Sequence, residues 1–150
     1  MVKSICPICL DTYTQPKASD TLTNSSDTAN TTQSATYVKV KEISLPTNFP
    51  VIGVMRVKFT LATNDATNNA TGRIYIDGVA TGAEQTTNST TGVEFSEDVT
   101  IPIGASKIQI YAKIANVAAK ATVSNFRIYN DLTCLCCGYD DSMKPHSIWE

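Results

Sequence analysis

The stretch "GVMRVKFTLA" (residues 53–62) alternates apolar and polar side chains along its length. From residue 55 on, every second residue is apolar, namely Met55, Val57, Phe59 and Leu61. Successive side chains of a β-strand point to opposite faces, so a period of two places one set inside and the other in solvent. This stretch therefore predicts a half-buried strand.

The same period recurs along the chain and predicts further strands over 37–45, 72–78, 92–101, 106–115 and 120–129. The second of these strands, 72–78, ends in Asp77-Gly78, a strong hairpin signal because both residue types tolerate positive φ. Near Ser124-Asn125 the apolar residues change parity, which indicates a β-bulge. We expect an all-β chain whose residues 37–130 form an antiparallel β-sandwich, with the jelly roll as one candidate topology.

Composition excludes several classes of function. The chain has 150 residues and a formal net charge of −2, and it lacks the basic stripe that nucleic-acid binding requires. It lacks an apolar run of the roughly 18–20 residues needed to span a membrane. The start "MVKSICPICL" lacks the long apolar region of a signal peptide, so we expect synthesis and folding in a cytoplasm.

Five cysteines lie at the two ends of the chain, in segments 1–10 and 131–150, while residues 11–36 are expected to form a linker or an extended arm. Cys6 with Cys9 and Cys134 with Cys137 form two C-x-x-C pairs. Four thiolates at this spacing suit a tetrahedral metal ion. A structural zinc held by both ends would close the chain into a long loop and make the fold thermostable.

"CPIC" and "CLCCG" resemble the two knuckles of zinc-ribbon and rubredoxin-type sites, although here the knuckles bracket almost the whole chain. The resemblance implies zinc or, less expected, iron as the ligand of the four cysteines. Disulfides and buried free thiols are the alternatives. The fifth cysteine, Cys136, is a spare ligand, a buried neighbour or an intermolecular bridge.

No catalytic set is evident. The chain has a single histidine, His146, and lacks facing carboxylates and phosphate-binding glycine motifs, so we expect no enzymatic activity. Tyr75 and Tyr111 fall on the polar faces of their strands, and Trp149 is the only tryptophan. These aromatic side chains are candidates for glycan stacking or for a protein interface. The alternative for the tyrosines is packing against a neighbour on the sheet surface.

Residues 99–129 contain a "P-x-G" turn, an "I-x-I-Y-A-K" strand and a last strand ending "N-F-R-I-Y". This part of the chain resembles the closing strands of β-sandwich surface, tail and turret proteins of phages and archaeal viruses. The resemblance implies a structural assembly subunit, located in the virion, that forms a homo-oligomer or contacts other virion proteins and the host surface. A glycan-binding module and a small metal-redox protein are the alternative functions.

Overall fold

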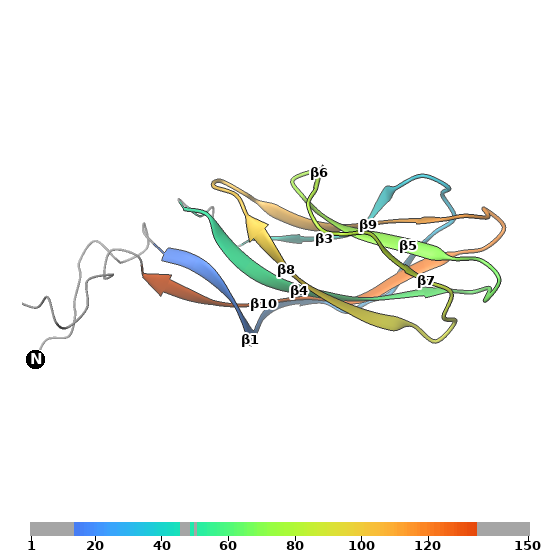
Figure 1. Ribbon diagram of the computed structural model, residues 1–150, viewed down its shortest axis with the longest axis horizontal. Helices are drawn as coiled ribbons and strands as arrows, with labels where there is room; N and C mark the ends of the chain where they lie inside the picture. Colours follow the sequence, from blue (N-terminus) through green and yellow to red (C-terminus); the bar gives the residue numbers. More distant parts are fainter. Residues whose placement is uncertain (1–13, 46–48, 50, 135–150) are drawn as a thin grey trace, which may run out of the picture.

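The computed structural model describes residues 14–45, 49 and 51–134, and within them the chain forms ten β-strands in two layers (Figure 1). The strands are β1 (Thr14–Ser26), β2 (Asn30–Thr32), β3 (Val38–Ser44), β4 (Gly53–Thr63), β5 (Ala70–Ile76), β6 (Val79–Ala80), β7 (Gln85–Thr87), β8 (Val93–Ile101), β9 (Lys107–Ile114) and β10 (Ala121–Cys134). Among the described residues, none belongs to a helix long and apolar enough to cross a membrane.

The strand order is that of a jelly roll. Sheet A has the order β1-β10-β4-β8, with β2 also pairing with β10, and sheet B has the order β3-β9-β5-β6, with β7 also pairing with β5. The antiparallel pairs β1/β10, β3/β9, β4/β8 and β5/β6–β7 follow one another as if a long hairpin were rolled up. The predicted all-β antiparallel sandwich is therefore confirmed.

The core lies between the inner faces of the two sheets and comes from the apolar members of the alternating stretches. In β4, Met55, Val57, Phe59 and Leu61 are at most 2% exposed. In β9, all the isoleucines are fully buried, namely Ile108, Ile110 and Ile114. The period of two thus identified the buried faces of both sheets.

Two local irregularities predicted from the sequence are present. Asp77 and Gly78 both have positive φ, 49° and 82°, and they join Ile76 to Val79 in the β5–β6 hairpin. In β10 the register with β4 shifts between Ser124 and Arg127, and Asn125 has a φ of 49°. This bulge returns the apolar side chains after it to the core.

Much of the predicted arm or linker, 11–36, belongs to sheet A. β1 pairs with β10 along its length, and β2 pairs with the start of β10. Pro16 is buried against Gly53, where the proline ring leaves no room for an added Cβ. The period of two in apolar residues did not predict these strands, because backbone pairing, rather than an apolar face, holds most of β1 in place.

Lys41 of β3 is buried in spite of its charge. A register shift between Lys39 and Lys41 turns the side chain of Lys41 inward, and its ammonium group donates a hydrogen bond to the carbonyl of Thr28. Burial lowers the pKa of Lys41, and the nearby Asp27 partly opposes this effect. The lysine links sheet B to the β1–β2 connection of sheet A.

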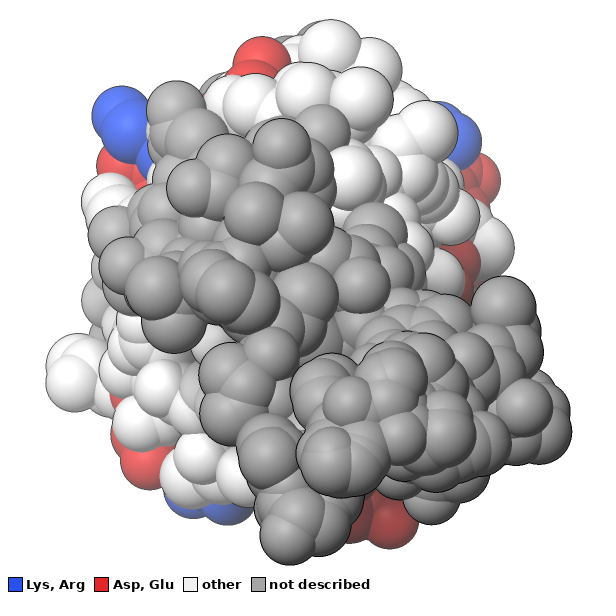
Figure 2. Space-filling view, turned by 90° about the vertical axis from the view of Figure 1, so that its left-hand side faces the viewer, with Lys and Arg blue, Asp and Glu red and all other residues white. Residues whose placement is uncertain are grey.

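The described chain begins and ends side by side, because Thr14 and Cys134 are register partners in the β1/β10 pair. Figure 2 views the molecule from this end, with Lys, Arg, Asp and Glu side chains visible around its rim. Cys6, Cys9, Cys137 and Trp149 lie outside the described residues, as does the side chain of Cys134. The predicted metal site of four cysteines therefore stays a prediction.

Candidate functional site

Three tyrosines gather on the outer face of sheet B. The rings of Tyr75 on β5 and Tyr111 on β9 stack with their centroids 3.9 Å apart and their planes at 16°. Tyr37, one residue before β3, packs against Tyr75 at 6.0 Å with an interplanar angle of 58°. All three are half-buried, so part of each ring reaches solvent. We call this surface the tyrosine face.

Tyr37 spans the sheet from β3 towards the segment before β7. Its hydroxyl donates a hydrogen bond of 2.8 Å to Glu84, while Lys113 of β9 places its ammonium nitrogen 4.6 Å from the Tyr37 ring centroid. Lys113 also lies 3.7 Å from the Glu84 carboxylate. Burial, followed by the contact with Glu84, raises the pKa of Tyr37, and the same hydrogen bond lowers the pKa of Glu84. The contacts fix Tyr37 in place as a neutral phenol.

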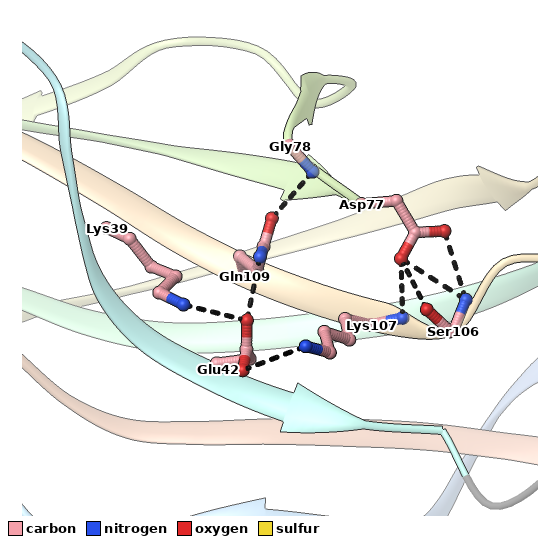
Figure 3. A network of polar contacts seen from close by, with 7 residues as sticks. All are labelled: Lys39, Glu42, Asp77, Gly78, Ser106, Lys107 and Gln109. Carbon is pink, nitrogen blue, oxygen red and sulfur yellow. Dashed lines mark hydrogen bonds and ion pairs between the residues drawn. The ribbon is translucent and has the colours of Figure 1, made fainter.

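A second polar cluster centres on Glu42 of β3 (Figure 3). The Glu42 carboxylate accepts hydrogen bonds from Lys39 at 3.0 Å and from Gln109 at 2.8 Å, and Lys107 lies 3.8 Å away. The bond from Gln109 lowers the pKa of Glu42 most, and the bond from Lys39 lowers it further. Gln109 in turn accepts a hydrogen bond of 2.8 Å from the backbone N–H of Gly78. The cluster joins β3, β9 and the β5–β6 hairpin.

Asp77 holds the hairpin turn against the start of β9, as Figure 3 shows. Its carboxylate accepts hydrogen bonds from the Ser106 hydroxyl at 2.8 Å and from the backbone N–H groups of Ser106 and Lys107, both at 3.0 Å. Burial raises the pKa of Asp77, but these hydrogen bonds outweigh it and leave the pKa below its usual value. The turn therefore forms a fixed border at one end of the tyrosine face.

The strand register places a cation on each side of Tyr111. Across the sheet, Tyr111 of β9 is opposite Lys39 of β3 and opposite Arg73 of β5. The Arg73 Nε donates a hydrogen bond of 2.6 Å to the carbonyl of Gly82. The face therefore combines aromatic rings with fixed donors and acceptors, an arrangement suited to binding a polar ligand with apolar faces.

The structure brings together two of the residues singled out from the sequence, Tyr75 and Tyr111, and they pack against each other. Sequence reasoning missed Tyr37, although its parity with Lys39 in "YVKVK" marks it as outward-facing. Its approach to Tyr75 could not be predicted without knowing that β9 lies between β3 and β5. Within the described residues, no group of three or more His, Cys, Asp or Glu side chains could hold a metal ion.

Comparisons with known proteins add little to this description. No family model matches the chain, and no curated protein matches it. Among solved structures, it is similar to the C-terminal CBM6 of LamC, a marine laminarinase from Zobellia galactanivorans. The match has 15% identity and a TM-score of 0.38, and it covers 77% of this chain and 98% of that chain. A likeness at this level carries no argument about function.

Proposed function

We propose that the protein is a non-enzymatic β-sandwich module that binds glycans on the tyrosine face. The observation that supports this function best is the stacked pair of Tyr75 and Tyr111, with Tyr37 beside it, on the outside of a sheet. Sugar rings have faces of C–H groups, and the electron-rich faces of aromatic rings attract such groups. Tyr75 and Tyr111 cover each other's facing sides, so the apolar area offered to a sugar ring is the part of the three half-buried tyrosines that reaches solvent.

The polar groups around the tyrosines match the other part of a sugar, its hydroxyl groups. Glu84 supplies acceptor oxygens beside Tyr37, and the cluster of Glu42 and Gln109 lies beside Tyr75. Because their mutual contacts already hold these side chains in place, little rotamer entropy is lost when a ligand binds. A rigid surface of this kind favours recognition of an extended oligosaccharide over a small, fully enclosed ligand.

A glycan array probed with the full chain tests the proposal, followed by calorimetric titration of the best ligand into variants. We expect Tyr111→Ala to abolish detectable binding, because it removes the ring in the centre of the sheet. Tyr129→Ala is the matched control, since Tyr129 is a half-buried outward tyrosine of sheet A with the Lys58 ammonium 4.9 Å from its ring centroid. Binding that survives in Tyr111→Ala, or is lost equally in Tyr129→Ala, would refute the proposed site.

The second candidate function is a virion assembly subunit, as the resemblance of residues 99–129 implies. Jelly rolls occur in viral capsid proteins as well as in lectins, so the fold suits both functions. Three large apolar side chains are more than half exposed towards one end of the sandwich: Ile52 at 54%, Ile103 at 63% and Leu132 at 56%. A hydrogen bond from Gly104 N–H to the Phe49 carbonyl brings the first two segments together. Exposed apolar residues in one region favour association.

Solution mass separates the two functions. An assembly subunit should form a homo-oligomer whose mass, measured by light scattering, rises with concentration, and Ile103→Asp should reduce that association. A chain that stays monomeric at millimolar concentration argues against self-assembly and leaves glycan binding untouched.

The metal site of four cysteines remains a separate proposal. It is supported by the pairing of Thr14 with Cys134, which places the departure points of the two cysteine-bearing segments on adjacent strands. Cys6, Cys9, Cys134 and Cys137 would bind a structural zinc ion. Iron in the same site would absorb visible light, whereas zinc would leave the protein colourless.

A further inference from the structure

From the charges on the tyrosine face we infer that its glycan ligand carries carboxylate or sulfate groups, an inference that rests on the proposed function. The chain as a whole has a net charge of −2. On this face, however, strands β3, β5 and β9 and the residue before β7 contribute four cations and two carboxylates. They are Lys39, Arg73, Lys107, Lys113, Glu42 and Glu84. Asp77, at the border of the face, adds a third carboxylate beside Lys107. Four cations and three carboxylates give a local formal charge of +1, opposite in sign to that of the whole protein.

Three of the four cations are engaged with the two carboxylates. Lys39 and Lys107 share Glu42, and Lys113 pairs with Glu84. Arg73 differs from them, because none of the ion pairs among the described residues involves its guanidinium group. Its Nε donates instead to a neutral carbonyl, that of Gly82. Arg73 is therefore the cation of this face that has no direct ion pair among the described residues, although its charge helps to lower the pKa of Glu84.

The position of Arg73 suits a ligand stacked on the tyrosines. Arg73 is directly opposite Tyr111 in the β5/β9 register, and Lys39 is opposite Tyr111 on the other side. Neighbouring strands are about 4.8 Å apart, which is comparable to the width of a sugar ring. One face of the Tyr111 ring is covered by Tyr75, so a sugar would contact the remaining exposed part of Tyr111 and extend its substituents over a neighbouring strand. Arg73 lies on β5, one of the two strands beside Tyr111.

The chemistry of the guanidinium group selects the class of substituent. Its planar fork of donors matches the two oxygens of a carboxylate or sulfate group, and charge-assisted bonds of this kind are stronger than those between neutral groups. Nε is already tied to Gly82, which orients the group, and none of the hydrogen bonds among the described residues uses its terminal nitrogens.

The test uses three hexasaccharides of similar length: a neutral glucan, a uronate oligomer and a sulfated oligomer. Each is titrated calorimetrically into the full chain at low and at physiological salt. We expect at least one anionic oligomer to bind on the order of tenfold more tightly than the neutral one, because hydrogen bonds to a charged group are stronger than those between neutral groups. Arg73→Gln should remove this preference and keep the weaker binding of the neutral oligomer. Arg73→Lys, which keeps the charge but loses the fork, should fall between the two.

Lys58→Gln is the control, because it removes a positive charge next to an outward tyrosine on sheet A. A preference for the uronate alone or the sulfated oligomer alone identifies the anion and supports the inference. Equal binding of neutral and anionic oligomers overturns the inference and leaves glycan binding intact. Binding of none of the three, together with an empty glycan array, overturns both. An anionic preference that persists in Arg73→Gln and Arg73→Lys, or that disappears in Lys58→Gln, overturns the assignment to this face.

Discussion

The fit between the two sheets can be tested at Gly72, a buried residue of β5 on the inner side of the strand that carries Arg73 and Tyr75. A Cβ added at Gly72 would lie 3.0 Å from Phe59 Cε2 and 3.5 Å from both methyl groups of Leu61. Phe59 is 1% exposed, and its ring is also packed 5.9 Å from that of Phe95. The ring therefore has little room to move away from a new methyl group.

Two opposing effects decide the outcome of Gly72→Ala. Alanine restricts the unfolded chain more than glycine, which stabilises a strand interior by about 0.5–1 kcal/mol. Overpacking a rigid core costs about 1–3 kcal/mol. With the Phe59 ring in place the second effect wins, and we expect a net loss of about 1 kcal/mol in the free energy of unfolding. Phe59→Leu removes the crowding ring atom, so Gly72→Ala in that background should stabilise by about 0.5 kcal/mol.

Equilibrium urea unfolding of the four proteins in this cycle, followed by far-ultraviolet circular dichroism, measures the coupling between the two sites. The expected coupling energy is about 1.5 kcal/mol, and the effect of Gly72→Ala changes sign between the backgrounds. If the alanine costs the same amount with and without the Phe59 ring, the inter-sheet contact does not explain why this position is glycine.

Three further predictions concern the turn, the tyrosine face and the cysteines. Gly78→Ala should lower the free energy of unfolding by about 1 kcal/mol, because a side chain at a φ of 82° is strained even though open space surrounds it. The raised pKa of Tyr37 stabilises the fold below the ordinary tyrosine pKa of about 10 and ceases to do so as the pH rises towards the raised value. Urea midpoints between about pH 8 and pH 11 should therefore fall more steeply in the wild type than in Tyr37→Phe. A chelator should lower the melting temperature, and Cys137→Ser should lose the bound zinc, whereas Cys136→Ser should retain it.

Each of these predictions has a distinct contrary result. A Gly78→Ala protein as stable as the wild type would mean that the hairpin tolerates another turn type. Parallel alkaline curves for the wild type and Tyr37→Phe would mean that the phenol is not held neutral by its surroundings. A melting temperature lowered by reductant and unchanged by chelator would identify disulfides in place of zinc.

Much of the sandwich could be predicted because its core strands alternate strictly. In β4 and β9 the inward positions are apolar without exception from Met55 to Leu61 and from Ile108 to Ile114. The alternation therefore predicts which side chains of these strands are buried. The hairpin at Asp77-Gly78 and the bulge near Asn125 were predictable for similar local reasons. The former depends on residue types that accept positive φ, and the latter on a change of parity.

β1 and the tyrosine face depend on information that is not local. β1 is rich in Thr and Ser, and its place in sheet A follows from backbone pairing with β10, which alternation does not reveal. Tyr37, Tyr75 and Tyr111 are nearly forty residues apart in the chain, and only the order β3-β9-β5 makes them neighbours. The inward turn of Lys41 likewise follows from a bulge whose pattern in "VKVKE" is indistinguishable from ordinary alternation.

The adjacency of Thr14 and Cys134 determines how the molecule would respond to mechanical tension. Force applied through the two segments that leave the sheet there would act at the first rung of the β1/β10 ladder and across the strands. Hydrogen bonds loaded in this direction break sequentially, one pair at a time from the loaded end, instead of sharing the force. A covalent or metal crosslink beside that first rung would carry the tension itself, and the long seam behind it would stay closed.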